Sequence, residues 1–183
     1  MMKKVFIICL FTIAAITGKA QDIVASTLKI GPFALDMKLQ DVEAITLKKY
    51  KTDVIKKSIE DYKPIEAHLN GVKFKLTFFE NYDDKGNSTN NYKLYRIECS
   101  DSKVKTKSGI MYGMDRNTLL QMVSKMDIGY TFSKYQEYDN DGKPTKKFNE
   151  SLSIYDSQAG KTLTIRLKEG KVSSFEIGYE EGC

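Results

Sequence analysis

The sequence predicts an α+β fold of two tandem repeats, in each of which one or two short helices pack on an antiparallel meander sheet. Residues 108–127 read as a Gly-Met turn followed by one amphipathic helix, and residues 30–45 contain a weaker copy 77 positions earlier. Runs of alternating apolar residues follow each copy, so helices precede strands instead of alternating with them. We therefore predict one repeat over 21–105 and a second over 106–183.

Corresponding positions of the two copies are apolar. The helix positions that match are Met37 with Met114, Val42 with Leu119, and Ile45 with Met122. Two strand trios, Tyr95-Ile97-Cys99 and Phe175-Ile177-Tyr179, match at a spacing of 80. The similar spacing of helix and strand favours duplication of a whole small domain.

Residues 1–20 have the pattern of a secretory signal peptide. Two lysines open the chain, an apolar run of about 13 residues follows, and small residues precede Gln21, the expected mature start. A membrane span needs roughly 20 apolar residues, so the run is too short for one. The Lys-Ala-Gln ending resembles signal peptides of Bacteroidetes, which implies a Gram-negative envelope protein that is periplasmic or released from the cell.

Net charge argues against a nucleic-acid partner. The whole chain carries +5, but three lysines leave with the signal peptide, so 26 basic and 24 acidic residues remain in the mature chain. Nucleic-acid-binding domains are usually strongly basic. The remaining 163 residues are enough for a buried core in one domain or two small ones.

The first repeat begins with helical periodicity. Apolar residues at helical spacing predict a helix over 38–50. The segment 52–62 is ambiguous, and either forms a second helix or stays irregular. Pro64 ends any helix there, because the residue before a proline favours extended backbone.

A hairpin follows in the first repeat. Strands over 65–69 and 72–79 flank Asn70-Gly71, the dipeptide that best suits a two-residue primed turn. The polar segment 81–92 predicts a loop, and the chain returns as a strand over 93–100. The next residues, 101–107, form either a solvated linker or an edge strand protected by alternating lysines.

The second repeat contains the clearer helix. Asp115 is the expected N-cap and Gly129 is expected near the C-terminal end. The buried stripe comprises Leu119, Met122, Val123 and Met126. Strands are then expected over 130–138, 147–155 and 162–167, and a last one ends near Tyr179 after the Glu169-Gly170 turn.

The segment Tyr112–Val123, YGMDRNTLLQMV, resembles the opening of the SmpA/OmlA envelope proteins and of the β-lactamase inhibitor protein family. In those families a Gly-Met-type turn leads into a short helix followed by an antiparallel sheet, and the inhibitor family repeats this unit in tandem. The first copy departs from the motif, since Asp36 stands where the glycine is expected. The resemblance implies a saddle-like pair of sheets whose open face binds another protein.

Two cysteines survive removal of the signal peptide. An oxidising compartment allows a Cys99–Cys183 disulfide, which closes a long loop. Cys183 is the last residue of the sequence, and geometry decides whether the bond forms. The disulfide therefore stays open at this stage.

Catalytic and metal sites have little support in the sequence. His68 is the only histidine and has no nucleophile signature near it, so we interpret it as an ordinary strand residue. Residues 137–148 resemble the start of a calcium loop, but Phe148 stands where the bidentate glutamate is required. We predict a hairpin turn there, no catalytic residues, no cofactor and no metal.

The sheet face away from the helices is the expected functional surface. If the apolar alternates of each strand face the helices, the opposite positions line an open face. The residues assigned to protein binding are Lys73, Lys75, Phe79, Arg96, Tyr155 and Arg166, and Glu98 and Thr164 share their face. A solvated face is the other interpretation of the same pattern.

These expectations favour a non-enzymatic, exported binding protein of the inhibitor or immunity type. The basic side chains of the open face predict an acidic surface on the partner. An envelope assembly or scaffolding factor is the first alternative. A small envelope hydrolase using scattered acids is the second.

Overall fold

The computed structural model describes residues 22–61, 63–138, 141 and 143–179. Over these residues the chain forms three helices and two sheets, which confirms the α+β class. The expected signal peptide and Cys183 lie outside the described residues, and so does most of the turn at 139–142.

A large antiparallel sheet forms the centre of the molecule, with strand order β4-β5-β6-β11-β10-β9-β8. The strands, in chain order, are β4 (Ile65–Leu69), β5 (Val72–Tyr82), β6 (Ser88–Cys99), β8 (Tyr130–Tyr138), β9 (Pro144–Asp156), β10 (Lys161–Lys168) and β11 (Lys171–Tyr179). The sequence predicts two sheets side by side. In the structure β6 pairs with β11, so the strands of both predicted repeats belong to one continuous sheet.

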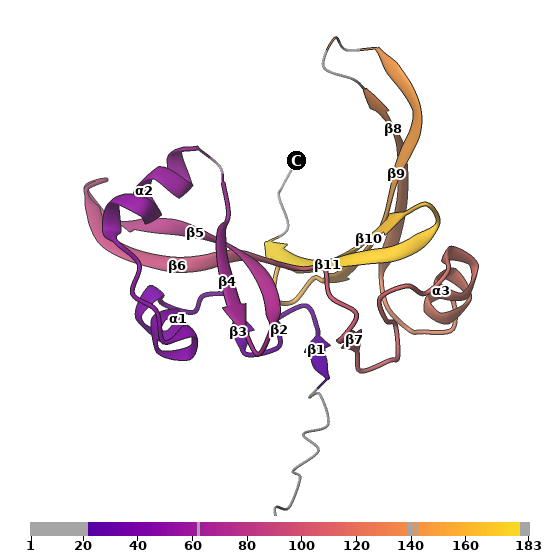
Figure 1. Ribbon diagram of the computed structural model, residues 1–183, viewed down its shortest axis with the longest axis horizontal. Helices are drawn as coiled ribbons and strands as arrows, with labels where there is room; N and C mark the ends of the chain where they lie inside the picture. Colours follow the sequence, from indigo (N-terminus) through magenta and orange to yellow (C-terminus); the bar gives the residue numbers. More distant parts are fainter. Residues whose placement is uncertain (1–21, 62, 139–140, 142, 180–183) are drawn as a thin grey trace, which may run out of the picture.

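A smaller sheet of order β3-β2-β1-β7 lies beneath the large one (Figure 1). Its strands are β1 (Ile23–Ala25), β2 (Lys29–Ile30), β3 (Phe33–Ala34) and β7 (Val104–Thr106). β7 pairs in parallel with β1 at the sheet edge, and both Val104 and Thr106 are buried. The solvated-linker interpretation of 101–107 is therefore wrong, and the edge-strand interpretation is right.

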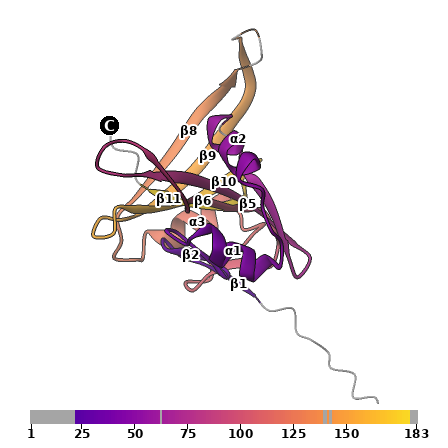
Figure 2. The ribbon, with the colours of Figure 1, turned by 90° about the vertical axis from the view of Figure 1, so that its left-hand side faces the viewer.

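The three helices lie on two sides of the large sheet. α1 (Leu39–Thr46), α3 (Arg116–Val123) and the small sheet cover one side, while α2 (Thr52–Glu60) lies on the other side along β5 (Figure 1). Figure 2 shows the β8–β9 hairpin rising beyond the sheet on the same side as α2. The ambiguous segment 52–62 is thus helical through Glu60, and it packs through the buried Ile55.

Both main helices end earlier than their apolar periodicity predicts. α1 stops at Thr46 because Leu47 adopts a left-handed conformation, with φ of 51°. α3 stops at Val123. The backbone bonds of Lys125 and Met126 then reach back three residues instead of four, as in Met126 N–H to the Val123 carbonyl at 3.0 Å. The apolar stripe therefore extends beyond the last residue of the helix, and Gly129 does not mark the end of the helix.

The two hairpins of β4, β5 and β6 differ in how well the sequence predicts them. Asn70 and Gly71 both have positive φ, as the primed turn requires. The loop expected over 81–92 is wrong, because β5 continues to Tyr82 and β6 starts at Ser88. The connecting turn is short, and the Asp83 carboxylate accepts the N–H groups of Lys85 and Asn87 within it.

A bulge in β6 changes the face on which Tyr95 lies. Thr77 pairs with Arg96 and Phe78 pairs with Leu94, so Tyr95 is an extra residue in the ladder. The prediction that Tyr95 shares the buried face with Cys99 is therefore wrong. A matching bulge interrupts β11. Arg166 pairs with Ser174 and Leu167 pairs with Val172, so Ser173 is an extra residue in this ladder.

The turns before α1 and α3 make the same backbone hydrogen bonds to strands. Before α1, Asp36 N–H donates to the Leu94 carbonyl and Leu94 N–H donates to the Met37 carbonyl, both at 2.9 Å. Asp36 has φ of 69°, so it adopts the conformation expected of the glycine that it replaces.

Before α3, Gly113 N–H donates to the Val172 carbonyl at 2.8 Å and Val172 N–H donates to the Met114 carbonyl at 2.9 Å. Gly113 has φ of 80°. Leu94 and Val172 are 78 positions apart in the sequence, as are the two bulged residues, Tyr95 and Ser173. These shared contacts recur at a spacing of 78 residues, two fewer than the spacing of 80 predicted from the side-chain pattern.

Candidate protein-interaction face

The candidate site is the face of the large sheet opposite α1, α3 and the small sheet, here called the open face. Strand register places on it the residues assigned from sequence: Lys73, Lys75 and Phe79 from β5, Arg96 from β6, Tyr155 from β9 and Arg166 from β10. One cross-strand row runs from Tyr155 through Thr162 and Gly178 to Arg96. The six residues therefore share a face, although Lys73 and Tyr155 lie near its opposite sides.

Two glutamates occupy the middle of the open face. Glu98 of β6 pairs directly with Glu176 of β11, and the next row positions outward are Lys75 and Thr164. Like charges placed directly opposite each other destabilise a sheet unless they are compensated. The surrounding cations provide that compensation.

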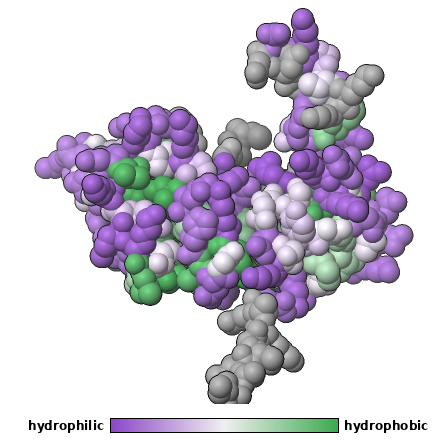
Figure 3. All heavy atoms as spheres, in the orientation of Figure 1, coloured by the Kyte–Doolittle hydropathy of each residue, from purple (hydrophilic) through white to green (hydrophobic). Residues whose placement is uncertain are grey.

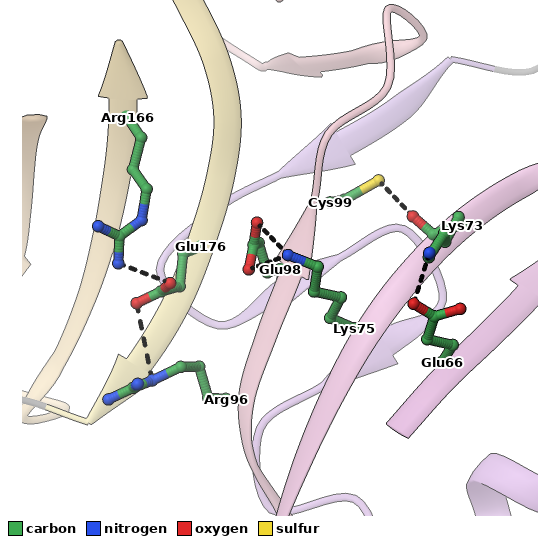
Figure 4. A network of polar contacts seen from close by, with 8 residues as sticks. All are labelled: Glu66, Lys73, Lys75, Arg96, Glu98, Cys99, Arg166 and Glu176. Carbon is green, nitrogen blue, oxygen red and sulfur yellow. Dashed lines mark hydrogen bonds and ion pairs between the residues drawn. The ribbon is translucent and has the colours of Figure 1, made fainter. Parts of the chain in front are cut away.

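Each glutamate is held by cations of the open face (Figure 4). Lys75 Nζ lies 3.2 Å from both carboxylate oxygens of Glu98. Arg166 Nη2 donates to Glu176 Oε2 at 2.9 Å, while Arg96 Nε lies 3.6 Å from Glu176 Oε1. The basic residues found from sequence are thus arranged around two acids.

Charge on the open face is close to balanced. The remaining lysine, Lys73, pairs with Glu66 of β4 at 2.5 Å. The face therefore presents four cations against the three carboxylates of Glu66, Glu98 and Glu176. Burial lowers the pKa of Arg166, but the hydrogen bond and charge of Glu176 outweigh it and hold that pKa above its ordinary value.

Two aromatic rings, Phe79 and Tyr95, continue the open face toward α2, and Tyr95 also contacts Tyr179 near the turn before α1. Phe79 meets Tyr95 edge-on with ring centroids 6.2 Å apart, and Tyr95 stacks on Tyr179 at 5.4 Å and 19°. The guanidinium carbon of Arg96 lies 5.8 Å from the Tyr95 ring centroid. These contacts restrain side chains that would otherwise be free to rotate.

Tyr179 also ties the sheet to the turn before α1. Its hydroxyl donates to Asp36, and Lys161 Nζ pairs with the same carboxylate at 3.0 Å. Burial and the hydrogen bond to Asp36 both raise the pKa of Tyr179. Burial acts to raise the pKa of Asp36 too, but the bonds from Tyr179 and Lys161 lower it overall.

A hollow of about 470 Å³ lies where α2 meets the open face. Ile59 and Pro64 line one side of it, and Lys75, Phe79 and Arg96 line the other. Three of the six residues assigned from sequence therefore border one depression. Tyr155 is outside this hollow and is 36% exposed.

A second hollow, of about 980 Å³, lies between the start of α3, the β8–β9 hairpin and the β10–β11 turn. Glu150 lines it, is buried, and pairs with Arg116 at 3.0 Å and Lys134 at 3.3 Å. Arg166 and Lys168 also line it. The cluster is a satisfied ion network on the helix side of β9.

Little in the described part of the chain has the arrangement of a catalytic or metal site. His68 lies on β4 opposite Lys73 and is exposed. No group of three or more histidine, cysteine, aspartate or glutamate side chains converges as metal ligands among the described residues. No helix in residues 22–61, 63–138, 141 and 143–179 is long and apolar enough to cross a membrane.

Sequence reasoning missed several residues of the open face. Glu176 alternates with the buried Phe175 and Ile177, so the period-two pattern could have placed it on the open face. Tyr95 gave no such signal, because a bulge reverses its direction. The contact between Asp36 and Tyr179 joins residues 143 positions apart and depends on the folded chain.

Cys99 is a buried thiol on the helix side of β6, and its Sγ donates to the Lys73 carbonyl at 3.5 Å. Burial raises its pKa to about 12, with smaller contributions from Asp101 and Glu98. The disulfide left open from the sequence involves Cys183, which lies outside the described residues.

Comparison of the chain with protein-family models, with curated proteins and with solved structures finds no significant match.

Proposed function

We propose that this chain is an exported, non-enzymatic protein-binding module of the inhibitor or immunity type, and that the open face contacts its partner. The single observation that carries the proposal is the restrained group of aromatic and arginine side chains between α2 and the β8–β9 hairpin. Tyrosine, phenylalanine and arginine are enriched at interface centres. Side chains already held by ion pairs and ring stacking lose less conformational freedom on binding.

The charge arrangement refines the kind of partner proposed. From the sequence alone, the four cations at strand positions of this face predict a strongly acidic surface on the partner. The ion pairs with Glu66, Glu98 and Glu176 favour a partner whose acidic groups meet Arg96 and Arg166 individually, within an otherwise polar and aromatic contact. Complementarity of this kind favours specificity more than raw affinity.

We also propose that the fold arose by duplication, as the predicted tandem repeats imply. Support comes from the matching hydrogen bonds at Asp36 and Gly113, and from the bulges at Tyr95 and Ser173. The direct pairing of Glu98 with Glu176, also 78 positions apart, supports an approximate two-fold axis between β6 and β11. On this proposal the two halves contribute one shared surface.

The test is site-specific photocrosslinking in cells that export the protein. A benzophenone amino acid replaces Thr164, which lies on the open face, or Gln121, which is exposed on α3 and serves as the matched control. The proposal expects a discrete protein adduct from position 164 and none from position 121. The partner is identified from the adduct and purified.

Affinity measurements then separate contact from misfolding. Thr164→Arg places bulk on the open face and is expected to weaken binding of that partner at least tenfold, whereas Gln121→Arg leaves the affinity unchanged. Circular dichroism and the urea midpoint establish that both variants are folded. Equal adducts from both positions, or equal affinities of a folded Thr164→Arg protein and the wild type, reject the open face as the binding surface.

A further inference from the structure

A lysine-rich surface lies at the end of the molecule formed by the α1–α2 loop and one flank of α2, far from the β8–β9 hairpin (Figure 1). It borders a hollow of about 550 Å³, and we call it the basic end. Its members are Leu47, Lys48, Lys49, Lys51, Val54, Lys57 and Lys63. Figure 3 shows apolar surface beside α2 within otherwise hydrophilic surroundings.

Leu47 is an unexpected residue at its position. It is 93% exposed, and its φ of 51° belongs to the left-handed region that glycine adopts at helix ends. Leucine pays a conformational penalty there and buries nothing in return. Neither local backbone preference nor packing within the described chain explains an apolar side chain at this point.

A second aliphatic side chain projects from the same surface. Val54 is 50% exposed, and helical spacing places it on one flank of α2 with Lys57 and Asp61. Asp53 and Glu60, which are seven residues apart, lie on another flank. Lys51 and Lys57 therefore lie on the same side of the molecule as Val54, while Asp53 and Glu60 do not line the hollow.

The hollow is lined by five lysines and by two carboxylates, Asp61 and Glu66. Asp61 pairs with Lys57 at 3.2 Å and with Lys63 at 3.9 Å, and both lysine side chains are more than 70% exposed. Exposed pairs of this kind are weak and rearrange readily. Lys49 also pairs with Glu43 at 2.7 Å, but its side chain is largely exposed, so the five lysines still outnumber the three nearby carboxylates and remain available to an anionic surface.

Two more lysines, Lys48 and Lys51, make no ion pair among the described residues. Lys48 Nζ lies 5.1 Å from the Tyr50 ring centroid, and Lys51 makes no ion pair with any described residue. The Tyr50 hydroxyl is buried and has no hydrogen-bond partner among the described residues. The loop is thus held by the Lys48–Tyr50 ring contact and by the bonds from Lys49 Nζ and Tyr50 N–H to Glu43.

We propose that the basic end binds the surface of an anionic phospholipid membrane. The exposed aliphatic chains of Leu47 and Val54 enter the boundary between head groups and acyl chains, and the surrounding lysines contact lipid phosphates. A protein partner is disfavoured because lysine is depleted from interface centres, where aromatic residues and arginine are enriched. Glu66 and Pro64 border both the basic end and the open face, but Leu47, Val54 and the lysines of the basic end are not among the residues assigned to the open face, so variants can test the two binding activities separately.

Vesicle sedimentation tests the proposal with the protein starting at Gln21, because residues 1–20 contribute an apolar segment of their own. Vesicles contain either phosphatidylcholine alone or phosphatidylcholine with 30 mol% phosphatidylglycerol, and salt is varied. Binding to the anionic vesicles is expected to weaken as salt rises, and the neutral vesicles are expected to leave the protein in solution. Each lysine near such a surface contributes about a fivefold change in partitioning.

Three variants assign the effect to the basic end. Lys48→Gln with Lys51→Gln is expected to lower partitioning about 25-fold. Leu47→Gly, which suits the left-handed backbone, is expected to lower it severalfold without lowering the melting temperature. The charge-matched control is Lys29→Gln with Lys125→Gln, two exposed lysines elsewhere, and it is expected to change partitioning much less.

Equal binding of the wild type to anionic and neutral vesicles overturns the proposal, as does failure to bind either. So does an equal loss in the basic-end lysine variant and its charge-matched control. Thr164→Arg on the open face is expected to sediment like the wild type. That variant therefore distinguishes failure of membrane binding from failure of the proposed protein interaction.

Discussion

Glu98 and Glu176 face each other directly across the junction of β6 and β11, the pairing that joins the strands of the two predicted repeats. Their carboxylates would repel each other in an otherwise neutral sheet. Lys75 neutralises one, while Arg96 and Arg166 neutralise the other. The cations assigned to partner binding therefore also hold the sheet together at its centre.

The Arg166–Glu176 pair is expected to contribute measurable stability. Glu176 has only 14% of its side chain exposed and accepts a 2.9 Å bond from Arg166, so solvent screens this pair less than most surface pairs. A double-mutant cycle with Arg166→Ala and Glu176→Ala is expected to give a coupling energy of about 1 kcal/mol in urea unfolding.

The matched control for that cycle is Lys73–Glu66 on the same face, where both side chains are about half exposed. Solvent screening predicts a smaller coupling there. A coupling at Arg166–Glu176 no larger than at Lys73–Glu66 contradicts a structural role for the central network.

Glu43 is expected to make stability depend on pH. It is buried on α1 and accepts bonds from Lys49 Nζ at 2.7 Å and from Tyr50 N–H at 2.8 Å. These bonds lower its pKa below the ordinary 4.5, although burial acts in the opposite direction. A carboxyl with a lowered folded-state pKa stabilises the fold above its unfolded value, and that contribution is lost as pH falls through the folded value.

Glu43→Gln is therefore expected to lower the free energy of unfolding by about 1 kcal/mol at pH 7, and the difference from wild type shrinks below pH 4.5. Urea unfolding at pH 7, 5 and 3.5 measures it. Glu60→Gln, on the exposed side of α2, controls for loss of a negative charge. A difference that stays constant down to pH 3.5 is the contrary result.

Cys99 is expected to resist alkylation in the folded protein. Its thiol is 1% exposed and burial raises its pKa to about 12, so little thiolate forms and reagent has no access. In a Cys183→Ser protein starting at Gln21, iodoacetamide at pH 8 should label Cys99 only after unfolding, as read by mass.

Rapid labelling of the native Cys183→Ser protein contradicts the buried position of Cys99. The protein with both cysteines answers the question left open by the sequence. If it unfolds without reductant and takes up no label, Cys99 and Cys183 are bridged; two labels show that they are free.

Two positions with positive φ are expected to respond in opposite ways to substitution. Gly113 has φ of 80° and no atom within 4 Å of an added Cβ, so Gly113→Ala isolates backbone strain and should cost about 1 kcal/mol. Leu47→Gly relieves that strain but loosens the unfolded chain, so its net effect should lie between zero and about 1 kcal/mol of stabilisation. Thermal and urea unfolding measure both, and a Leu47→Gly protein markedly less stable than wild type contradicts the strain assigned to Leu47.

Local sequence signals predicted the elements well where one face of an element was continuously apolar. The α3 stripe at Leu119 and Val123 and the Asn70-Gly71 turn are set by neighbours within a few residues. The Asp115 cap is equally local, since its carboxylate accepts the Thr118 N–H at 3.0 Å. Predictions based on Gly129 and on the polar segment 81–92 failed, because those residues allow a turn without requiring one.

The open face was predictable only in part. Alternation placed Lys75 and Arg166 correctly, since period two holds along an uninterrupted strand. Alternation misplaced Tyr95, because Tyr95 is the extra residue of a bulge in β6. A bulge interrupts the alternation of faces along the strand. The pairing of each cation with an acid on another strand also depends on register between strands.

The sequence by itself determined the α+β class, the positions of α1, α3 and most strands, and the apolar faces, because these follow from periodicity and turn chemistry within short segments. Tertiary structure decided that β6 and β11 join into one sheet, that Glu98 faces Glu176, and that Tyr179 reaches Asp36. Such contacts connect residues dozens of positions apart, and no local pattern encodes which distant strand edges will meet. The charge balance of the open face was decided at the same level, since it depends on which strands become neighbours.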